Sequence, residues 1–246
     1  MSSLVIERLS KNFGGLQALR DLSLGIQPGE RRAIIGPNGA GKTTLFHLIG
    51  GQLSPSSGRI LLFGREVSKL PPFRRAALGL GRTFQITTLF ANLTVLENML
   101  LAVQALDSIR LVVYRPLASY HHIRDRARRL LEQWNLWEKR SAQVRQLSYG
   151  EQRQLEILLA LASMPKVLLL DEPTAGLSAA ETKQVVTMIQ QLDPDISVLL
   201  IEHDMDVAFQ VAQRIAILHQ GRLLADGPPE AIRKDATVAE IYLGVD

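Results

Sequence analysis

A nine-residue glycine-rich stretch constrains the fold of this chain more than any other feature. Residues 36–44 read GPNGAGKTT and fit the pattern G-x-x-x-x-G-K-[ST]. Backbone N–H groups of such a loop curve around phosphates, its lysine reaches the outer phosphates, and its hydroxyl meets Mg²⁺. An apolar strand is predicted before the loop at 33–35, and a helix after it at 45–49, whose N-terminal dipole favours an anion. This context distinguishes the stretch from an ordinary glycine-rich turn and predicts a phosphate-binding loop.

Chain length and composition allow a large core and exclude several kinds of chemistry. The chain has 246 residues, of which 46% are hydrophobic, so it can bury a substantial core. It contains no cysteine, which excludes disulfides, thiolate metal sites and cysteine nucleophiles and suits a reducing cytoplasm. Glu7 and Arg8 stand where a signal peptide needs apolar residues, and no later run approaches the roughly 18 apolar residues of a membrane span. We therefore expect any link to a membrane to be made through a partner.

The net charge of +4 is modest and comes partly from two basic clusters, Arg74–Arg75 and the stretch 121–129. A nucleic-acid-binding protein would be expected to add zinc-ligand spacing or a basic motif interleaved with aromatics, and the sequence has neither. We interpret both clusters as solvated helix faces. Charge alone does not assign a function.

Short apolar segments between turn residues predict an α/β fold with a mainly parallel core sheet and an antiparallel β subdomain. Residues 167–170 and 196–201 are continuous apolar runs, as expected of strands buried on both faces of a parallel sheet, and 178–192 fits the crossover helix between them. Residues 71–81 are interpreted as a basic loop. The other predicted elements are strands at 4–9, 22–26, 59–63, 215–218 and 223–225, a strand end at 82–85, and helices from about 229 and 238.

The middle third is predicted to be helical. Residues 92–106 continue at helical spacing, and an apolar run at 109–114 ends before a proline. A stripe of apolar side chains then marks an otherwise charged helix, and Trp134 and Trp137 are expected to pack inside this part. We expect one domain over 1–246, with a core formed by 1–86 and 163–246 and an inserted helical subdomain at about 87–162.

Three buried strands are predicted to end in polar residues. One ends at Gly36, one at Asp171-Glu172 and one at His203. Ligands of an open α/β sheet lie beyond the carboxyl ends of the strands, so these three ends should converge on one site. Adjacent carboxylates at the end of a buried strand are costly unless they bind something.

The residue types at these strand ends suit phosphoryl transfer, which needs positioning and charge neutralisation. Lys42 and the loop amides would hold the β- and γ-phosphates, and Thr43 and Asp171 would place Mg²⁺. Glu172 would orient or deprotonate the attacking water, and His203 would contact the γ-phosphate. No arginine finger is recognisable, so we expect further contacts from another subunit, with a serine at a helix start as the candidate. That serine is Ser148.

Three residues have open interpretations on local evidence. Phe13 lies in a glycine-rich turn, where an aromatic ring either packs as a plug or stacks on an adenine base. The amide of Gln85 either holds a metal or water or lies on the surface without a role. Ser148 is either a helix cap alone or also part of an anion site.

The sequence resembles the ATP-binding subunits of ABC transporters in six features that occur in the family's order and cover nearly the whole chain. They are GPNGAGKTT, Gln85, LSYGEQ, VLLLDEP, TAGLS and His203. The resemblance implies a P-loop NTPase fold in which two subunits sandwich two ATP molecules, each loop facing the signature helix of the other. Dimer closing and opening then drives a membrane partner. Glu172 would be the catalytic base, Phe13 the adenine-stacking aromatic, and Gln85 a sensor near the membrane domain. The implied nucleotide contacts are Phe13, Gly36, Asn38, Gly39, Gly41, Lys42, Thr43, Thr44 and Gln85, the metal ligands Thr43, Gln85 and Asp171, and the trans signature Ser148, Gly150 and Gln152.

Two positions depart from the family pattern. Tyr149 replaces the usual first glycine of the signature, and Ser178 stands where many members have aspartate. We expect Tyr149 to be tolerated, because the phosphate contacts come mainly from the serine and the backbone. The loop at Ser178, which the resemblance places at the dimer seam, carries no firm expectation.

Within the family, segments such as Arg82–Gln85 and the closing Tyr242-Leu243-Gly244 look like the importers of branched-chain amino acids. The urea and amide importers and the lipopolysaccharide-export ATPase share these features in part, and they stay as alternatives. The resemblance implies two permease subunits and a second ATPase subunit, which is either a copy of this chain or a related ATPase. It also implies an indirect link to a periplasmic solute-binding protein and a place at the cytoplasmic face of the inner membrane. A soluble ABC-type ATPase acting on nucleic acid or ribosomes is disfavoured, because such proteins usually carry two cassettes or long coiled coils.

Overall fold

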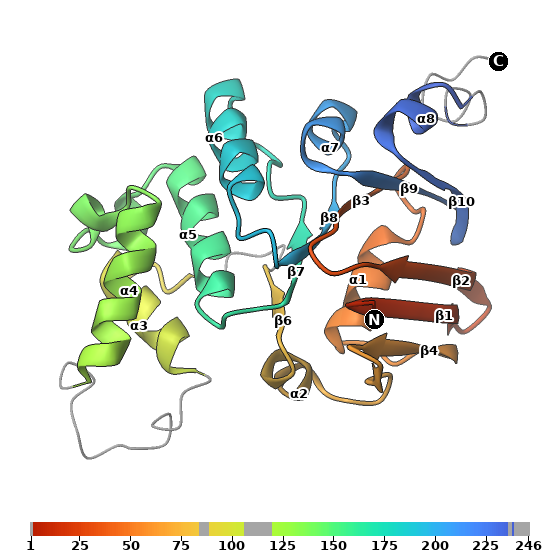
Figure 1. The fold of residues 1–246 in the computed structure, drawn as a ribbon, viewed down its shortest axis with the longest axis horizontal. Helices are drawn as coiled ribbons and strands as arrows, with labels where there is room; N and C mark the ends of the chain where they lie inside the picture. Colours follow the sequence, from red (N-terminus) through yellow and green to blue (C-terminus); the bar gives the residue numbers. More distant parts are fainter. Residues whose placement is uncertain (1, 84–88, 106–119, 236–237, 239–246) are drawn as a thin grey trace.

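The computed structural model describes residues 2–83, 89–105, 120–235 and 238. Within these residues the strands form a six-stranded, mainly parallel sheet in the order β10-β9-β3-β8-β7-β6 and a four-stranded antiparallel sheet in the order β2-β1-β4-β5. The predicted α/β fold is confirmed, with the two sheets lying on either side of the first helix (Figure 1). The strands are β1 (Leu4–Phe13), β2 (Leu16–Ile26), β3 (Arg31–Ile35), β4 (Ser57–Leu62), β5 (Arg65–Glu66), β6 (Leu80–Arg82), β7 (Val167–Asp171), β8 (Ser197–Ile201), β9 (Arg214–His219) and β10 (Arg222–Gly227).

Several helices begin directly after serine or threonine residues that cap their N-termini. Ser148 and Ser178 are both N-caps, and in each case a glutamate three residues later completes a capping box. The helix predicted from residue 92 begins at Val95, because Thr94 is its N-cap. The helices are α1 (Lys42–Gly50), α2 (Pro72–Ala77), α3 (Val95–Gln104), α4 (His121–Gln133), α5 (Tyr149–Leu161), α6 (Ala179–Gln190), α7 (Met205–Val211) and α8 (Pro229–Arg233), with 3₁₀ turns at Trp137–Lys139 and Val144–Gln146.

The parallel sheet is buried on both faces, as its continuous apolar runs predict. Side chains of successive strand residues point to opposite faces, so Leu168 and Leu170 of β7 pack in one core cluster while Val167 and Leu169 pack in the other. All five residues of β7 and of β8 are buried. Parallel pairing of β3 with β8 and of β8 with β7 aligns the carboxyl ends of these strands.

Helix α1 lies between the two sheets and fixes the loop that precedes it. Leu45, Phe46, Leu48 and Ile49 are fully buried in the same cluster as apolar residues of the antiparallel sheet. Burying each such side chain contributes about 1.5–3 kcal/mol, so the start of this helix is firmly placed.

The interpretation of residues 71–81 as a solvated basic loop is wrong. Residues Pro72–Ala77 form α2, and Arg75 is only 1% exposed. A proline at the start and five following residues without β-branching suit a short helix. The arginine faces inward because backbone carbonyls of α1 are within reach of its guanidinium. Arg74 is exposed, as expected.

Helices α3, α4 and α5 lie side by side at one end of the molecule, away from the antiparallel sheet (Figure 1). The apolar stripe of α4 is confirmed, because Ile123, Ala127 and Leu131 are buried. Trp134 and Trp137 are partly buried against the same cluster. Three predictions fall outside the described residues: the strand end beyond residue 83 with Gln85, the apolar run 109–114, and the helix from 238.

Candidate functional site

The glycines of the loop 36–44 are required by close neighbours or by backbone geometry. A Cβ atom on Gly36 would lie 2.1 Å from the Leu218 carbonyl oxygen, which belongs to β9. Gly41 has a φ of 102°, and a Cβ there would lie 2.7 Å from the Ala18 carbonyl oxygen of β2. Gly39 has a φ of 78° with open space in front of it. The loop is therefore held from both sides while its tip stays accessible.

Lys42 begins α1 and turns back over the loop. Its Nζ donates hydrogen bonds to the carbonyl oxygens of Gly36 (2.6 Å) and Pro37 (3.1 Å). Burial lowers the pKa of Lys42, and the nearby carboxylates Glu172 and Asp171 act in the opposite direction. The ammonium is thus held among neutral carbonyls and two acids, where a phosphate anion can exchange for a carbonyl partner.

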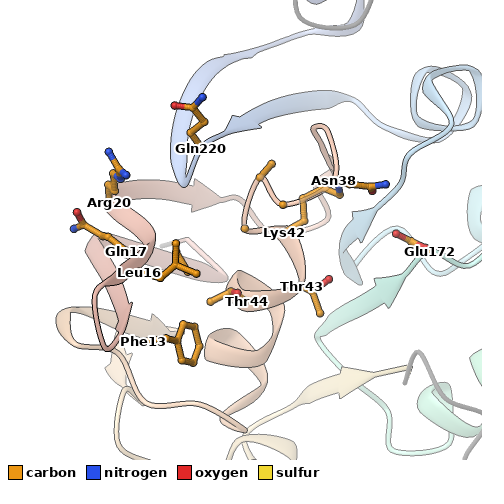
Figure 2. Close-up of a pocket in the computed structure, with 14 residues that line it drawn as sticks. Phe13, Leu16, Gln17, Arg20, Asn38, Lys42, Thr43, Thr44, Glu172 and Gln220 are labelled. Atoms are coloured by element: carbon orange, nitrogen blue, oxygen red, sulfur yellow. The ribbon is translucent and has the colours of Figure 1, made fainter.

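A pocket of about 600 Å³ lies in front of the loop (Figure 2). Its walls come from the loop, from the β1–β2 hairpin, from the β9–β10 turn and from Glu172. Phe13 stands at one side with its ring 43% exposed, and Lys11 lies 5.1 Å from the ring centroid. The ring is therefore a wall of the pocket and not a plug in the core. Its role in stacking stays a prediction.

Five residues that line this pocket were missed from the sequence: Leu16, Gln17, Ala18, Arg20 and Gln220. Four belong to β2 and one to the turn after β9. The only local signal is at Gln220, whose φ of 46° and following glycine mark a tight turn. The hairpin is held to the β9–β10 turn by a long-range contact, the hydrogen bond from Arg20 N–H to the Gly221 carbonyl (2.8 Å).

Asp171 ends β7 and is 1% exposed. Its Oδ2 lies 3.4 Å from Nη2 of Arg82, and its backbone N–H donates to Thr83 Oγ1 at 3.3 Å. Its Oδ1 is buried and has no hydrogen-bond partner among the described residues. Burial raises the pKa of Asp171, while the Arg82 guanidinium acts to lower it. A buried carboxylate oxygen without a hydrogen-bond partner is costly, so Oδ1 of Asp171 is suited to bind a cation or a hydrogen-bond donor.

Glu172 follows Asp171 and lines the pocket opposite the hairpin (Figure 2). It has a φ of 45°, a left-handed conformation that is uncommon for a residue with a side chain. Its backbone N–H donates to the Ile201 carbonyl oxygen of β8 at 3.0 Å, which fixes this conformation. The backbone strain turns the carboxylate toward the loop and is typical of residues with a functional role.

His203 follows β8, and its side chain is exposed. Its Nδ1 lies 4.0 Å from Oε2 of Glu202. Glu202 is buried and accepts hydrogen bonds from the backbone N–H (3.2 Å) and the hydroxyl (2.8 Å) of Thr174. His203 is not among the residues that line the pocket, so the structure brings Glu172 to the pocket wall but not His203.

The signature residues Ser148, Gly150 and Gln152 begin α5 and do not line this pocket either. Ser148 Oγ accepts the Glu151 N–H at 3.2 Å, and the Gln152 amide donates to the Leu147 carbonyl at 3.2 Å. Tyr149 is 47% exposed. One chain therefore brings together the loop, the hairpin and Glu172, but not the signature.

A phosphate-binding loop joins β3 to α1, and two acids follow β7, a parallel strand separated from β3 by β8. This arrangement defines a P-loop nucleotide-binding protein. The family model described as ABC transporter matches residues 19–175, and the model described as Branched-chain amino acid ATP-binding cassette transporter matches residues 222–246. The chain belongs to the ABC transporter ATP-binding proteins, as a branched-chain amino acid transporter ATPase.

Several relatives and solved structures match over nearly the full length. The high-affinity branched-chain amino acid transport ATP-binding proteins LivG of Escherichia coli and BraF of Pseudomonas aeruginosa are 39% and 38% identical, each over 98% of this chain and 97% of the relative. The lipopolysaccharide export system ATP-binding protein LptB of Escherichia coli is 34% identical over 100% of this chain and 99% of its own.

Among solved structures, the ADP conformation of the ATP-binding cassette MJ1267 of an ABC transporter has a TM-score of 0.89 at 28% identity, covering 99% of each chain. A dimeric post-hydrolysis cassette, MJ0796 bound to ADP and Pi, has a TM-score of 0.77 at 27% identity, covering 92% of this chain and 98% of that one. The predictions of fold, of an ATPase and of the branched-chain amino acid class are confirmed.

Proposed function

We propose that this chain binds and hydrolyses ATP to drive the import of branched-chain amino acids through a membrane partner. The observation that carries the proposal is the single pocket formed by the phosphate loop, the β1–β2 hairpin and Glu172 in a chain of this family. Lys42 and the loop amides hold the phosphates of ATP, and Asn38, Thr43 and Thr44 line the same space. Phe13 stacks on the adenine from the hairpin.

A Mg²⁺ ion fits beside the loop. Thr43 lines the pocket, and Asp171 offers the buried Oδ1 that lacks a partner among the described residues. Oxygen ligands of this kind suit Mg²⁺, and Gln85 completes the proposed set. When bound, the ion neutralises charge on the β- and γ-phosphates. Arg82 keeps the Asp171 carboxylate oriented through Oδ2, which leaves Oδ1 directed elsewhere.

Glu172 is the proposed general base. Its strained backbone directs the carboxylate at the pocket, where it can accept a proton from the water that attacks the γ-phosphate. His203 contacts the γ-phosphate in the closed state of the dimer. Because His203 does not line the pocket of the single chain, closure has to bring it nearer.

Each ATP site is completed by a second ATPase subunit. Ser148, Gly150 and Gln152 do not line the pocket of their own chain, so we assign them to the nucleotide held by the partner subunit. The serine hydroxyl and the backbone N–H groups at the start of α5 suit a γ-phosphate. A related cassette is dimeric in its post-hydrolysis state, which supports this arrangement.

The chain is proposed to divide into a core of 1–86 and 163–246 and a helical subdomain at about 87–162. Between these parts lies a largely apolar groove of about 360 Å³, with Phe73 66% exposed at its side. None of the helices in the described part of the chain is long and apolar enough to cross a membrane. We propose that one permease subunit docks at this groove and the other permease subunit docks on the second ATPase subunit, which places the chain at the cytoplasmic face of the inner membrane. A periplasmic solute-binding protein acts indirectly, and nucleic acid is not an expected partner.

The variant Glu172→Gln tests the catalytic role. It should bind ATP and form a dimer, while hydrolysis falls by about 10²- to 10⁴-fold, the usual contribution of a general base. On the purified chain, phosphate release measures hydrolysis, and light scattering measures the ATP-dependent formation of the dimer. Glu132→Gln, at an exposed position of α4, is the matched control and should keep full activity. Undiminished turnover of Glu172→Gln would remove Glu172 from this role.

Recovery of the tagged chain from detergent-solubilised membranes tests the partner class. Two permeases and a second ATPase subunit should copurify with it. ATPase activity that nucleic acid stimulates, with no membrane protein recovered, would contradict the transporter assignment.

A further inference from the structure

The Glu181 carboxylate lies over the start of the signature helix. Glu181 is the third residue of α6, and its Oε1 accepts the backbone N–H of Gly150, 31 residues earlier, at 3.1 Å. A Cβ atom on Gly150 would lie 2.7 Å from both Cγ and Oε1 of Glu181. A side chain at position 150 would therefore displace the Glu181 side chain from its present place.

Helix capping explains only part of this geometry. Oε2 of Glu181 accepts the backbone N–H (3.0 Å) and the hydroxyl (2.7 Å) of Ser178, which is the capping box of α6. The contact with Gly150 adds nothing to that cap. Hydrogen bonds from the Ser178 hydroxyl, the Ser178 N–H and the Gly150 N–H lower the pKa of Glu181, so the side chain is negatively charged at neutral pH.

A second contact holds the same two segments together. Gly176 has a φ of 75°, and a Cβ there would lie 3.3 Å from the ring of Tyr149. Arg153 lies over the other part of that ring, 5.8 Å from its centroid. Tyr149 and Ser178, the two departures from the family pattern, are thus both parts of one unit that joins the start of α5 to the loop before α6.

We propose that Glu181 is a positioning residue of the ATPase reaction, which holds the start of α5 and competes with the γ-phosphate of the partner subunit's nucleotide for the Gly150 N–H. The proposal rests on the proposed function, in which the signature faces that nucleotide. One backbone N–H cannot donate a strong hydrogen bond to both anions, and two anions at one helix N-terminus repel each other. ATP-driven dimer closure therefore has to displace the carboxylate.

The variant Glu181→Gln separates the charge from the cap. Glutamine at this position of a capping box still accepts the hydrogen bonds of Ser178, so α6 should keep its start. Removing one negative charge from a helix N-terminus should lower the ATP concentration at half-maximal dimerisation by about fivefold. The difference should shrink as salt is raised from 0.05 to about 1 M, because charge repulsion is screened.

The experiment measures ATP-dependent dimerisation by light scattering, with Glu172→Gln as the parent so that ATP is not consumed. Glu97→Gln in the same parent is the matched control. Glu97 holds the equivalent place in the capping box of α3, and its pKa is also lowered, first by the backbone hydrogen bond from Thr94. It should dimerise like the parent.

The outcomes distinguish the inference about Glu181 from the proposed function on which it rests. A parent that dimerises at the same or a lower ATP concentration than the Glu181→Gln variant overturns the competition between Glu181 and phosphate while leaving the proposed function intact. An equal gain in the Glu97→Gln control also overturns it, since capping would then explain the effect. A parent that binds ATP and never dimerises rejects a site shared by two copies of this chain, and with it the inference for such a dimer.

Discussion

Arg75 should contribute far more to stability than its place in a basic cluster indicates. Its guanidinium donates to the carbonyl oxygens of Leu48 (2.6 Å) and Ile49 (2.7 Å) at the end of α1, and to those of Leu70 (2.9 Å) and Ser68 (3.0 Å). The last carbonyls of a helix lack partners within the helix, so this side chain supplies them. Burial lowers its pKa to about 10, which leaves it charged at neutral pH.

The size of the effect follows from these contacts. Replacement by methionine keeps most of the volume but leaves the carbonyls of Ile49, Leu70 and Ser68 without this donor, at about 1.5–2 kcal/mol each, or about 5 kcal/mol in all. The Leu48 carbonyl keeps the Gly51 N–H at 3.3 Å. Arg75 has no carboxylate partner among the described residues, and burying its charge costs free energy that the methionine variant does not lose. This gain offsets part of the lost stability. We expect Arg75→Met to lower the free energy of unfolding by about 3 kcal/mol, which is a loss of roughly 6–12 °C in Tm for a chain of this size.

Thermal unfolding followed by circular dichroism, together with urea titration, measures this loss. The matched control is Arg74→Met, because Arg74 is adjacent in sequence and exposed. It should change stability by less than about 0.5 kcal/mol, as surface substitutions usually do. Equal losses in the two variants, or no loss in Arg75→Met, would refute the role given to the four hydrogen bonds.

Two further predictions concern the pocket and the buried carboxylates. Phe13→Ala should raise the KM for ATP about tenfold with little change in kcat, since stacking contributes about 1–3 kcal/mol per base, whereas Phe90→Ala, at another exposed ring, should leave KM unchanged. Burial raises the pKa of Glu202, although hydrogen bonds from Thr174 oppose the shift. The folded state therefore keeps this proton to a higher pH than the unfolded state, so stability should fall as pH rises from about 4.5 through the folded pKa. Glu202→Gln should flatten that decline in urea titrations at pH 5–8, and an unchanged slope would contradict it.

The positions of the site residues on the sheet could be predicted because they depend on local patterns. Continuous apolar runs identify strands buried on both faces, and the carboxyl ends of parallel strands meet at one edge, which places Glu172 near the loop. Segment 71–81 could not be predicted, because the partners of Arg75 are carbonyls 5 to 27 residues away in sequence. The contact of Glu181 with Gly150 spans 31 residues and leaves no local pattern either.

Two of the groups assigned to phosphate, the Lys42 ammonium and the Gly150 N–H, are engaged with the chain itself. Lys42 Nζ binds two carbonyls of its own loop, and the Gly150 N–H binds the Glu181 carboxylate. Phosphate must therefore exchange with these internal partners, and the net gain per contact is smaller than the strength of an isolated charge-assisted hydrogen bond. The two exchanges differ because Lys42 replaces neutral carbonyl oxygens with a phosphate anion. The Gly150 N–H instead replaces one anion, the Glu181 carboxylate, with another, the phosphate. Binding of ATP at the loop should thus be favourable within a single chain. The free energies of the open and closed dimer should differ little, which suits an ATPase whose dimer must reopen after each hydrolysis.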